Sequence, residues 1–328
     1  MNKFSRRSFL KRVALASVVS GTILATGNNS VEGAIGPKAT VINLTKCDGC
    51  IGEPIPKCVN ACRINNSGRF PNIEGHAPIP AYWPRKIYED WTDKKHIIDR
   101  LTPFNWIYVA SVKADGQQLY IPRRCMHCEN PPCYHLCPFG AYGHYQDSSV
   151  VVKEDICFGG AKCRQDCPWG VPQRQAGVGL YLKIAPKYGG GGVVYKCDQC
   201  HDLINVGQQP ACVSACEKVH TFGDKAEMQN LALRRKDEIN GYIYGLEENG
   251  GTSVFYVSPV PFESINKAMY DQGIVDGKPG RSGMPPGIGN KLEELNGWAQ
   301  SLLIAPIATM FTAGFTAYKS LKKPGDEK

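Results

Sequence analysis

The fifteen cysteines of this 328-residue chain constrain its fold more than any other feature, because all of them fall into regular motifs. Each of the four motifs closes with two cysteines separated by three residues. The motifs are Cys47, Cys50, Cys58 and Cys62; Cys125, Cys128, Cys133 and Cys137; Cys157, Cys163 and Cys167; and Cys197, Cys200, Cys212 and Cys216. Because no cysteine is left over, a single kind of chemistry should explain the whole set.

Disulfides, zinc sites and iron–sulfur clusters all use cysteines in sets. An odd number of cysteines with repeated Cys-x2-Cys pairs is not typical of a disulfide framework. Zinc ribbons use two Cys-x2-Cys pairs, whereas the second pair here is always stretched to Cys-x3-Cys. That spacing, with a proline directly after Cys137 and Cys167, is typical of iron–sulfur proteins. The pattern therefore favours iron–sulfur clusters, with structural zinc or disulfides as the alternative.

The chain resembles the four-cluster, ferredoxin-like electron-transfer (beta) subunits of respiratory oxidoreductases. That family includes the subunits of formate dehydrogenase, nitrate reductase and polysulfide reductase. The resemblance covers about residues 40–225, where the four motifs recur in order. The segments "RRCMHCENPPCYHLCP", "CPWGVP" and "GTSVFYVSPVPFESIN" are most similar to the hydrogenase-2 branch of the family.

The resemblance implies that the motifs exchange ligands in nested pairs, the first motif with the fourth and the second with the third. The implied ligand sets are Cys47, Cys50, Cys58 and Cys216; Cys197, Cys200, Cys212 and Cys62; Cys125, Cys128, Cys133 and Cys167; and Cys157, Cys163 and Cys137. The first three sets would each bind a [4Fe-4S] cluster. His127 and His201, beside cluster cysteines, are expected to hydrogen-bond within the cluster environment.

The third motif lacks one cysteine, because Gly160 stands where the spacing requires its second. Glycine has no side chain to offer a metal. A cube held by only three protein thiolates readily lacks its corner iron, so we expect a [3Fe-4S] cluster with a higher reduction potential here. Some members of the family replace this same cysteine. A solvent-derived fourth ligand and loss of the cluster are the alternatives, and the retained Cys137, Cys157 and Cys163 disfavour the second.

The N-terminus has the pattern of a twin-arginine export signal. Arg6 and Arg7 precede Phe9 and Leu10, and a modest apolar run follows at 13–25, too short to span a bilayer comfortably. Residues 1–34 contribute about half of the formal charge of +8, so the basic balance does not indicate nucleic-acid binding. We expect residues 1–34 to be a signal peptide and the protein to be exported.

A second apolar segment, 298–318, contains no charged residue and is bounded by Trp298 and Tyr318. Its length suits one membrane crossing, and aromatic residues belong at the two interfaces. Lys319, Lys322 and Lys323, just past this segment in the tail 319–328, predict that this end lies in the cytoplasm. The alternative is a buried amphipathic helix. We expect the protein to be anchored on the periplasmic side of the bacterial inner membrane.

The remaining segments predict local structure. In the insertion 63–124, "NWIYVASV" and "QQLYIP" are typical of a hairpin around "KADGQ", and the tryptophans Trp83, Trp91 and Trp106 are expected to pack locally. The segment "KAEMQNLALRRKDEI" predicts a helix, and "TSVFYVS" a strand, within the extension 226–290. "YGGGG" predicts a loop, and "KPGRSGMPPGIGN" a linker.

The expected fold is α+β: two tandem double-cluster ferredoxin-like modules with insertions, followed by a single C-terminal transmembrane helix. The sequence shows no Ser/His/Asp set, no nucleotide fingerprint, and no molybdenum or nickel signature. We therefore expect an electron-transfer subunit without its own substrate site. Its partners would be a catalytic subunit, most simply the small subunit of a [NiFe] hydrogenase, and an integral membrane quinone-reactive subunit. A formate dehydrogenase or a molybdenum or sulfur-compound oxidoreductase is the alternative.

Overall fold

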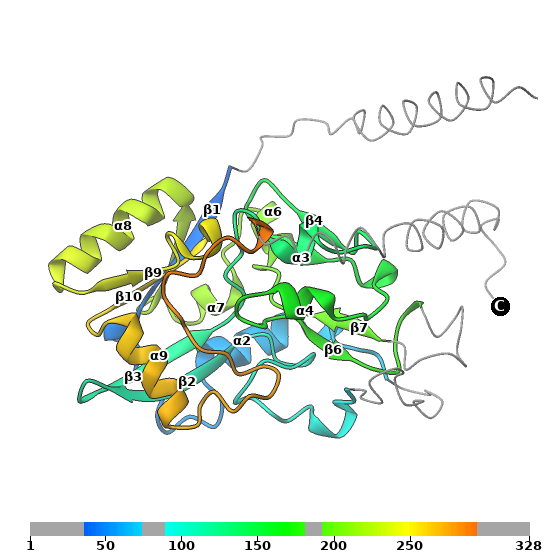
Figure 1. Ribbon diagram of the computed structural model, residues 1–328, viewed down its shortest axis with the longest axis horizontal. Coiled ribbons are helices and arrows are strands. Elements are labelled where there is room, and N and C mark those ends of the chain that lie inside the picture. Colours follow the sequence, from blue (N-terminus) through cyan, green and yellow to red (C-terminus); the bar gives the residue numbers. More distant parts are fainter. Residues whose placement is uncertain (1–35, 74–88, 181–191, 294–328) are drawn as a thin grey trace, which may run out of the picture. The chain divides into compact units, whose positions relative to one another are not determined.

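The computed structural model describes residues 36–73, 89–180 and 192–293, which belong to one compact unit beginning at Gly36 (Figure 1). The expected signal peptide (1–34), membrane helix (298–318) and tail (319–328) lie outside the described residues, as do Trp83 and most of the "YGGGG" loop. The strands are β1 Lys38–Asn43, β2 Tyr108–Ala114, β3 Gln117–Arg123, β4 Tyr142–His144, β5 Val150–Val152, β6 Gln173–Gln175, β7 Val193–Tyr195, β8 His220–Asp224, β9 Tyr242–Tyr244 and β10 Val254–Ser258. The helices are α2 Lys57–Asn65, α3 Pro132–His135, α4 Lys162–Asp166, α6 His201–Asn205, α7 Ala211–Ser214, α8 Lys225–Glu238 and α9 Phe262–Asp271.

The largest sheet brings together strands from both ends of the described chain. Its order is β8-β1-β10-β9, with β1 and β10 parallel and the other neighbours antiparallel. β1 directly precedes the first cysteine motif, whereas β8 directly follows the fourth. Because β1 and β8 are antiparallel, with Ile42 opposite His220, the first and fourth motifs lie side by side at the same end of the sheet.

The two faces of this sheet bury different sets of side chains. On one face α8 packs against β1, β10 and β8 (Figure 1). A small core of Val41, Phe255, Met228 and their neighbours fills the interface. On the other face, alternate residues such as Ile42 and Tyr256 join the larger core that also contains the cysteines. This alternation is the period of two that a strand imposes on its side chains.

The insertion forms the hairpin that its sequence predicts. β2 and β3 pair antiparallel from Tyr108↔Arg123 to Ala114↔Gln117, around a tight turn at Asp115 and Gly116. Helix α9 packs on β2, and its buried residues Phe262, Ile265 and Met269 recur at helical spacing. Trp106 is 2% exposed and belongs to the core, which confirms the expected local packing of this tryptophan.

The segment 278–290 packs against the rest of the protein more closely than a linker would. Residues 278–290 have no regular structure, as expected, but Met284 is fully buried in the main core. Leu101 donates its backbone N–H to the carbonyl of Gly280 at 3.0 Å.

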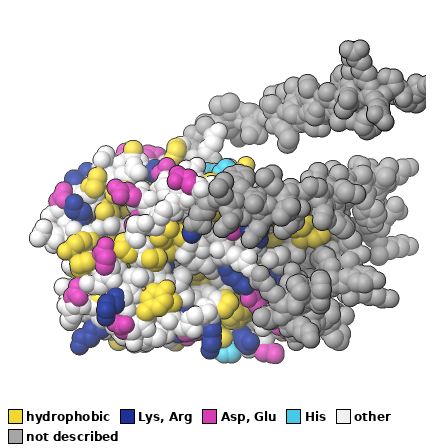
Figure 2. Space-filling view, in the orientation of Figure 1, with side chains coloured by type: hydrophobic (Ala, Val, Ile, Leu, Met, Phe, Trp, Pro, Cys, Tyr) yellow, Lys and Arg dark blue, Asp and Glu magenta, His cyan; other side chains and the backbone are white. Residues whose placement is uncertain are grey.

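On the face that Figure 2 shows, basic and acidic side chains are interspersed among hydrophobic ones.

Mixed helices and strands are consistent with the expected α+β ferredoxin-like class. Helix α8 and strand β10 form where the sequence predicts them. Across the three described ranges, no helix has the length and apolar character that a membrane crossing requires.

Candidate iron–sulfur site

In every motif a short helix carries the first cysteine of the closing Cys-x3-Cys pair, and these helices pack in nested pairs. Helix α2 carries Cys58 and Cys62 and packs against α7, which carries Cys212. Helix α3 carries Cys133 and packs against α4, which carries Cys163. The first motif therefore meets the fourth, and the second meets the third.

Other cysteines gather around four of the thiols. Burial raises the pKa of Cys58, Cys62, Cys133 and Cys163, and neighbouring cysteines raise it further, while Lys196 opposes the effect at Cys133 and Tyr142 opposes it at Cys163. These neighbours are Cys212, Cys47, Cys216 and Cys50 at Cys58; Cys197, Cys212 and Cys200 at Cys62; Cys125, Cys167 and Cys128 at Cys133; and Cys157, Cys137 and Cys167 at Cys163. Cysteines from motifs far apart in the sequence are thus close in space.

One of these groups surrounds an enclosed cavity. Cys125, Cys128, Cys133 and Cys167 all line it, together with Trp169 and Lys196. Prolines and valines complete the wall, so water has little access to the four sulfur atoms. Four thiols around a mostly apolar cavity, with one cation in the wall, form a donor set that fits an anionic iron–sulfur cluster.

The first loop of every motif has the same backbone turn. The residue two positions after the first cysteine has a left-handed backbone, with φ of 69° at Gly49, 48° at His127, 66° at Gly159 and 65° at Gln199. A left-handed residue in a tight turn directs successive backbone N–H groups to one side, where they can surround an anion. The third motif keeps this turn although it lacks a cysteine at 160.

Polar groups point at several of the sulfur atoms. The N–H of Ala141 lies 3.4 Å from Cys137 Sγ, and the N–H of Gln199 lies 3.5 Å from Cys197 Sγ. Asn66 Nδ2 lies 3.6 Å from Cys62 Sγ. Hydrogen bonds to a thiolate favour its charged form, so these contacts prepare the sulfur atoms for metal binding.

Burial raises the pKa of Cys47 to about 11, and the charges of Cys216 and Cys50 add to this effect, while the N–H of Gly49 opposes it. Burial also raises the pKa of Cys157 to about 11. Without metal these thiols would hold their protons at neutral pH, so binding of iron has to displace those protons.

The zinc and disulfide alternatives require other geometries. All fifteen cysteines are free thiols. A single zinc ion needs its donors around one point, and no such group of three or more His, Cys, Asp or Glu side chains occurs in the described ranges 36–73, 89–180 and 192–293.

The two histidines beside cluster cysteines differ. His127 is fully buried, and its Nε2 lies 3.6 Å from Cys197 Sγ, which belongs to a different motif. His201 instead contacts Asp147 Oδ2 at 2.7 Å and Ser149 Oγ at 2.9 Å. His127 therefore contacts the sulfur of a cluster cysteine, as expected. His201 instead contacts Asp147 and Ser149 in a neighbouring loop.

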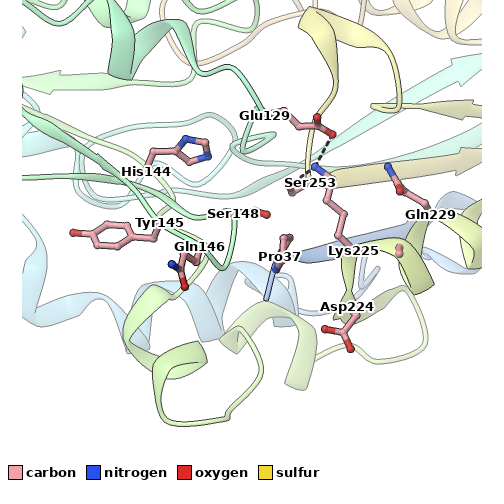
Figure 3. A pocket seen from close by; sticks show the side chains of 11 residues that line it. Pro37, Glu129, His144, Tyr145, Gln146, Ser148, Asp224, Lys225, Gln229 and Ser253 are labelled. Atoms are coloured by element: carbon pink, nitrogen blue, oxygen red, sulfur yellow. Dashed lines mark hydrogen bonds and ion pairs between the residues drawn. The ribbon is translucent and has the colours of Figure 1, made fainter. Parts of the chain in front are cut away.

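A surface hollow of about 640 Å³ lies apart from the cysteines (Figure 3). Its one lysine, Lys225, pairs with Glu129 at 2.7 Å and contacts Ser253 Oγ at 3.3 Å. His144 and Tyr145 lie on the opposite side of the hollow from Lys225 (Figure 3). Asp224, which also lines the hollow, pairs with Lys38 at 2.7 Å.

Comparison with known proteins agrees with the thiol geometry. The family model of the 4Fe-4S dicluster domain matches residues 117–225. The iron-sulfur subunit of the nitrate-inducible formate dehydrogenase of Escherichia coli is 37% identical over 232 residues, which are 67% of this chain and 67% of that subunit. The chain belongs to the family of iron–sulfur electron-transfer subunits of respiratory oxidoreductases.

Other members of the family are also similar. Hydrogenase-2 operon protein HybA of Escherichia coli O157:H7 is 24% identical over 311 residues, covering 81% of this chain and 84% of HybA. The B subunit of the anaerobic dimethyl sulfoxide reductase of Escherichia coli is 37% identical over 179 residues, covering 53% of this chain and 67% of that subunit. Our protein spans about two thirds of the formate dehydrogenase and dimethyl sulfoxide reductase subunits. As an iron–sulfur subunit of this family, the protein carries electrons and leaves substrate conversion to another subunit.

Proposed function

We propose that this subunit holds four clusters, three [4Fe-4S] and one [3Fe-4S], in the nested ligand sets that the family resemblance implies. The observation that carries the proposal is the packing of α2 against α7 and of α3 against α4, which brings the first motif to the fourth and the second to the third. The cavity lined by Cys125, Cys128, Cys133 and Cys167 supports the third set independently. When bound, each cluster supplies reversible one-electron oxidation and reduction.

We infer that the four proposed ligand sets follow one another in a line. Besides burial, Cys212 of the second set raises the pKa of Cys58 in the first. Cys125 of the third set likewise raises the pKa of Cys197 in the second, and Cys167 of the third raises the pKa of Cys163 in the fourth. In this order the three-cysteine set would lie at one end, and the set of Cys47, Cys50, Cys58 and Cys216 at the other.

The group with three cysteines would hold the [3Fe-4S] cluster. Its loop keeps the left-handed turn at Gly159, and Cys137, Cys157 and Cys163 remain close together. The backbone at Gly160 is not left-handed, and a Cβ atom there would meet no atom within 4 Å. Gly160 is therefore not required by crowding or by backbone conformation, which supports a functional reason for the missing ligand.

We place the subunit on the periplasmic side of the inner membrane, anchored by 298–318. It would relay electrons between a catalytic subunit, proposed as the small subunit of a [NiFe] hydrogenase, and a quinone-reactive membrane subunit. The match with HybA supports the hydrogenase partner, because it spans more of both proteins than the matches with the formate dehydrogenase and dimethyl sulfoxide reductase subunits do. A formate dehydrogenase partner is the second candidate, supported by the higher identity of 37%.

Metal analysis and electron paramagnetic resonance test the cluster assignment. The purified protein should contain roughly 15 iron atoms per molecule with a similar amount of acid-labile sulfide. An oxidised [3Fe-4S] cluster is paramagnetic, whereas oxidised [4Fe-4S] clusters of the usual type are silent. A strong signal in the oxidised protein that disappears in Cys157→Ser is expected. Iron in full amount without that signal would refute three-ligand binding, and zinc in place of iron would refute the electron-transfer function.

The catalytic partner is tested by affinity purification of the tagged protein from mildly solubilised membranes. A copurifying nickel-containing subunit that reduces dyes with hydrogen is the expected result. A molybdenum-containing subunit active with formate would replace the hydrogenase with the second candidate.

A further inference from the structure

Two of the cysteine motifs are preceded by a basic residue that is buried. Arg124 precedes Cys125 and is 2% exposed, and Lys196 precedes Cys197 and is 4% exposed. Burying a positive charge is costly unless a negative charge compensates it. Neither residue forms an ion pair with a carboxylate among the described residues, so their compensation has to come from elsewhere.

The two bases cross over. Lys196, beside Cys197, directs Nζ to Cys125 Sγ at 3.6 Å. Arg124, beside Cys125, directs Nη1 to Cys197 Sγ at 3.9 Å. Each base therefore contacts the sulfur of the motif to which it does not belong. Because Cys125 lies in the third ligand set and Cys197 in the second, this crossed pair occupies the junction between the two inner sets.

The contacts on each base fix its direction. Lys196 Nζ also donates to the carbonyl of Cys197 at 2.9 Å and to the carbonyl of Val150. Among the described residues, Arg124 Nε and Nη2 have no hydrogen-bond partner. Buried donors without partners are rare in native proteins, which indicates that Arg124 faces an additional negatively charged acceptor.

His127 is the third donor at this junction. Its Nδ1 accepts the backbone N–H of Val150 at 3.1 Å, so that nitrogen carries no proton. The proton must then reside on Nε2, which lies 3.6 Å from Cys197 Sγ. The junction thus combines two cations and one neutral donor within a region that water does not reach.

We infer that Arg124 and Lys196 raise the reduction potential of the cluster across the junction: Lys196 acts on the set containing Cys125, and Arg124 on the set containing Cys197. The inference rests on the ligand sets proposed above. Reduction adds one electron, and hence one negative charge, to a cluster without any bond being broken. A fixed cation near the sulfur stabilises that added charge, and burial strengthens the effect because there is little water to screen it. Both bases therefore influence the electron-transfer step between the two inner clusters.

Lys46 provides a matched control. It precedes Cys47 as Lys196 precedes Cys197, but its side chain is exposed to water. Water screens an exposed charge strongly, so Lys46 should have little influence on any cluster.

The test is a redox titration of the whole protein, followed by low-temperature electron paramagnetic resonance. Signals of the second and third sets are first assigned with Cys200→Ser and Cys133→Ser. Lys196→Gln should lower the midpoint potential of the set containing Cys125 more than that of the set containing Cys197. Arg124→Gln should lower the midpoint potential of the set containing Cys197 more than that of the set containing Cys125. Lys46→Gln should shift neither potential. Lys196→Arg, which keeps the charge, should restore most of the potential.

The inference would be overturned if each variant mainly shifted the potential of the set that contains the cysteine next to it in sequence. Equal shifts in Lys46→Gln and Lys196→Gln would also overturn it. If a glutamine variant fails to keep its cluster, wild-type protein labelled with ¹⁵N-lysine decides the matter. A hyperfine coupling between one lysine nitrogen and the reduced third cluster supports the inference, and its absence refutes it. Iron content of the wild type is measured first, so failure of the ligand sets themselves would be recognised separately.

Discussion

Trp169 Nε1 donates a hydrogen bond to the phenol oxygen of Tyr244 at 2.7 Å, and both side chains are 1% exposed. Trp169 follows Cys167 by two residues and lines the cavity of the third ligand set. The hydroxyl of Tyr244 in turn donates to the carbonyl of Pro285 at 3.1 Å. One tyrosine therefore ties a cluster loop to the C-terminal extension through two buried bonds.

Tyr244→Phe should destabilise the protein by about 1–3 kcal/mol, because it leaves the buried indole N–H without an acceptor. Iron should also be lost faster from the third set when a chelator is added. Thermal unfolding and the absorbance of the clusters near 400 nm measure the two effects. Tyr242→Phe, on the same strand but 44% exposed, is the control and should change stability by less than about 0.5 kcal/mol. Equal effects of the two variants would contradict a specific role for the bond.

Adjacent glycines in the third motif should respond differently to alanine. Gly159 has a φ of 66°, and a Cβ there would lie 2.4 Å from the backbone oxygen of Gly192. Gly159→Ala should therefore cost more than about 1 kcal/mol and reduce the occupancy of the fourth set. Gly160→Ala meets open space and should be nearly neutral. Iron content and the signal of the oxidised protein, compared between the two variants, check this prediction.

Gly160→Cys should add a fourth thiolate to the three-cysteine set. Because the backbone and the space at 160 accept a side chain, we expect the protein to gain one iron atom. The signal of the oxidised [3Fe-4S] cluster should disappear, and a reduced [4Fe-4S] signal at lower potential should replace it. Gly160→Ser is the control of similar size. Retention of the oxidised signal in Gly160→Cys would show that residue 160 does not face the cluster.

Removal of iron should unfold the cluster region before the sheet. Helices α3, α4, α6 and α7 have only four or five residues, too few to persist without the metal or tertiary contacts. The sheet of β1 and β10 has its own small core with α8. Hydrogen exchange of the iron-free protein should therefore be fastest in those helices and slowest in β1 and β10. Uniform exchange along the chain would contradict this separation.

Local elements of the fold follow from sequence patterns. The alternation in "NWIYVASV" and "QQLYIP", with a turn between them, predicts the β2–β3 hairpin, and the helical spacing after residue 225 predicts α8. The parallel pairing of β1 with β10 does not follow, because nothing local in "KATVIN" indicates a partner more than 200 residues away. The burial of Met284 was not predicted either, because its glycine- and proline-rich surroundings are typical of an exposed linker.

The sequence likewise predicts some features of the candidate site and not others. Cysteine spacing predicts which residues bind iron, and glycine at 49 and 159 agrees with the left-handed turns found there. His127 and Gln199 adopt the same turn without any glycine, so the repeat is visible only in the backbone. The crossing of Arg124 and Lys196 also depends on the distance between two loops, which sequence does not contain.

The position of β1 has a consequence for the order in which the protein can be assembled during synthesis. Both neighbours of β1, the strands β8 and β10, leave the ribosome long after it, since they lie at 220–224 and 254–258. Until then β1 has two unpaired edges, and the first cysteine motif has no completed sheet behind it. The second and third motifs, which lie close together between residues 125 and 167, can meet much earlier. Maturation is therefore expected to begin in the middle of the chain and to end where translation began.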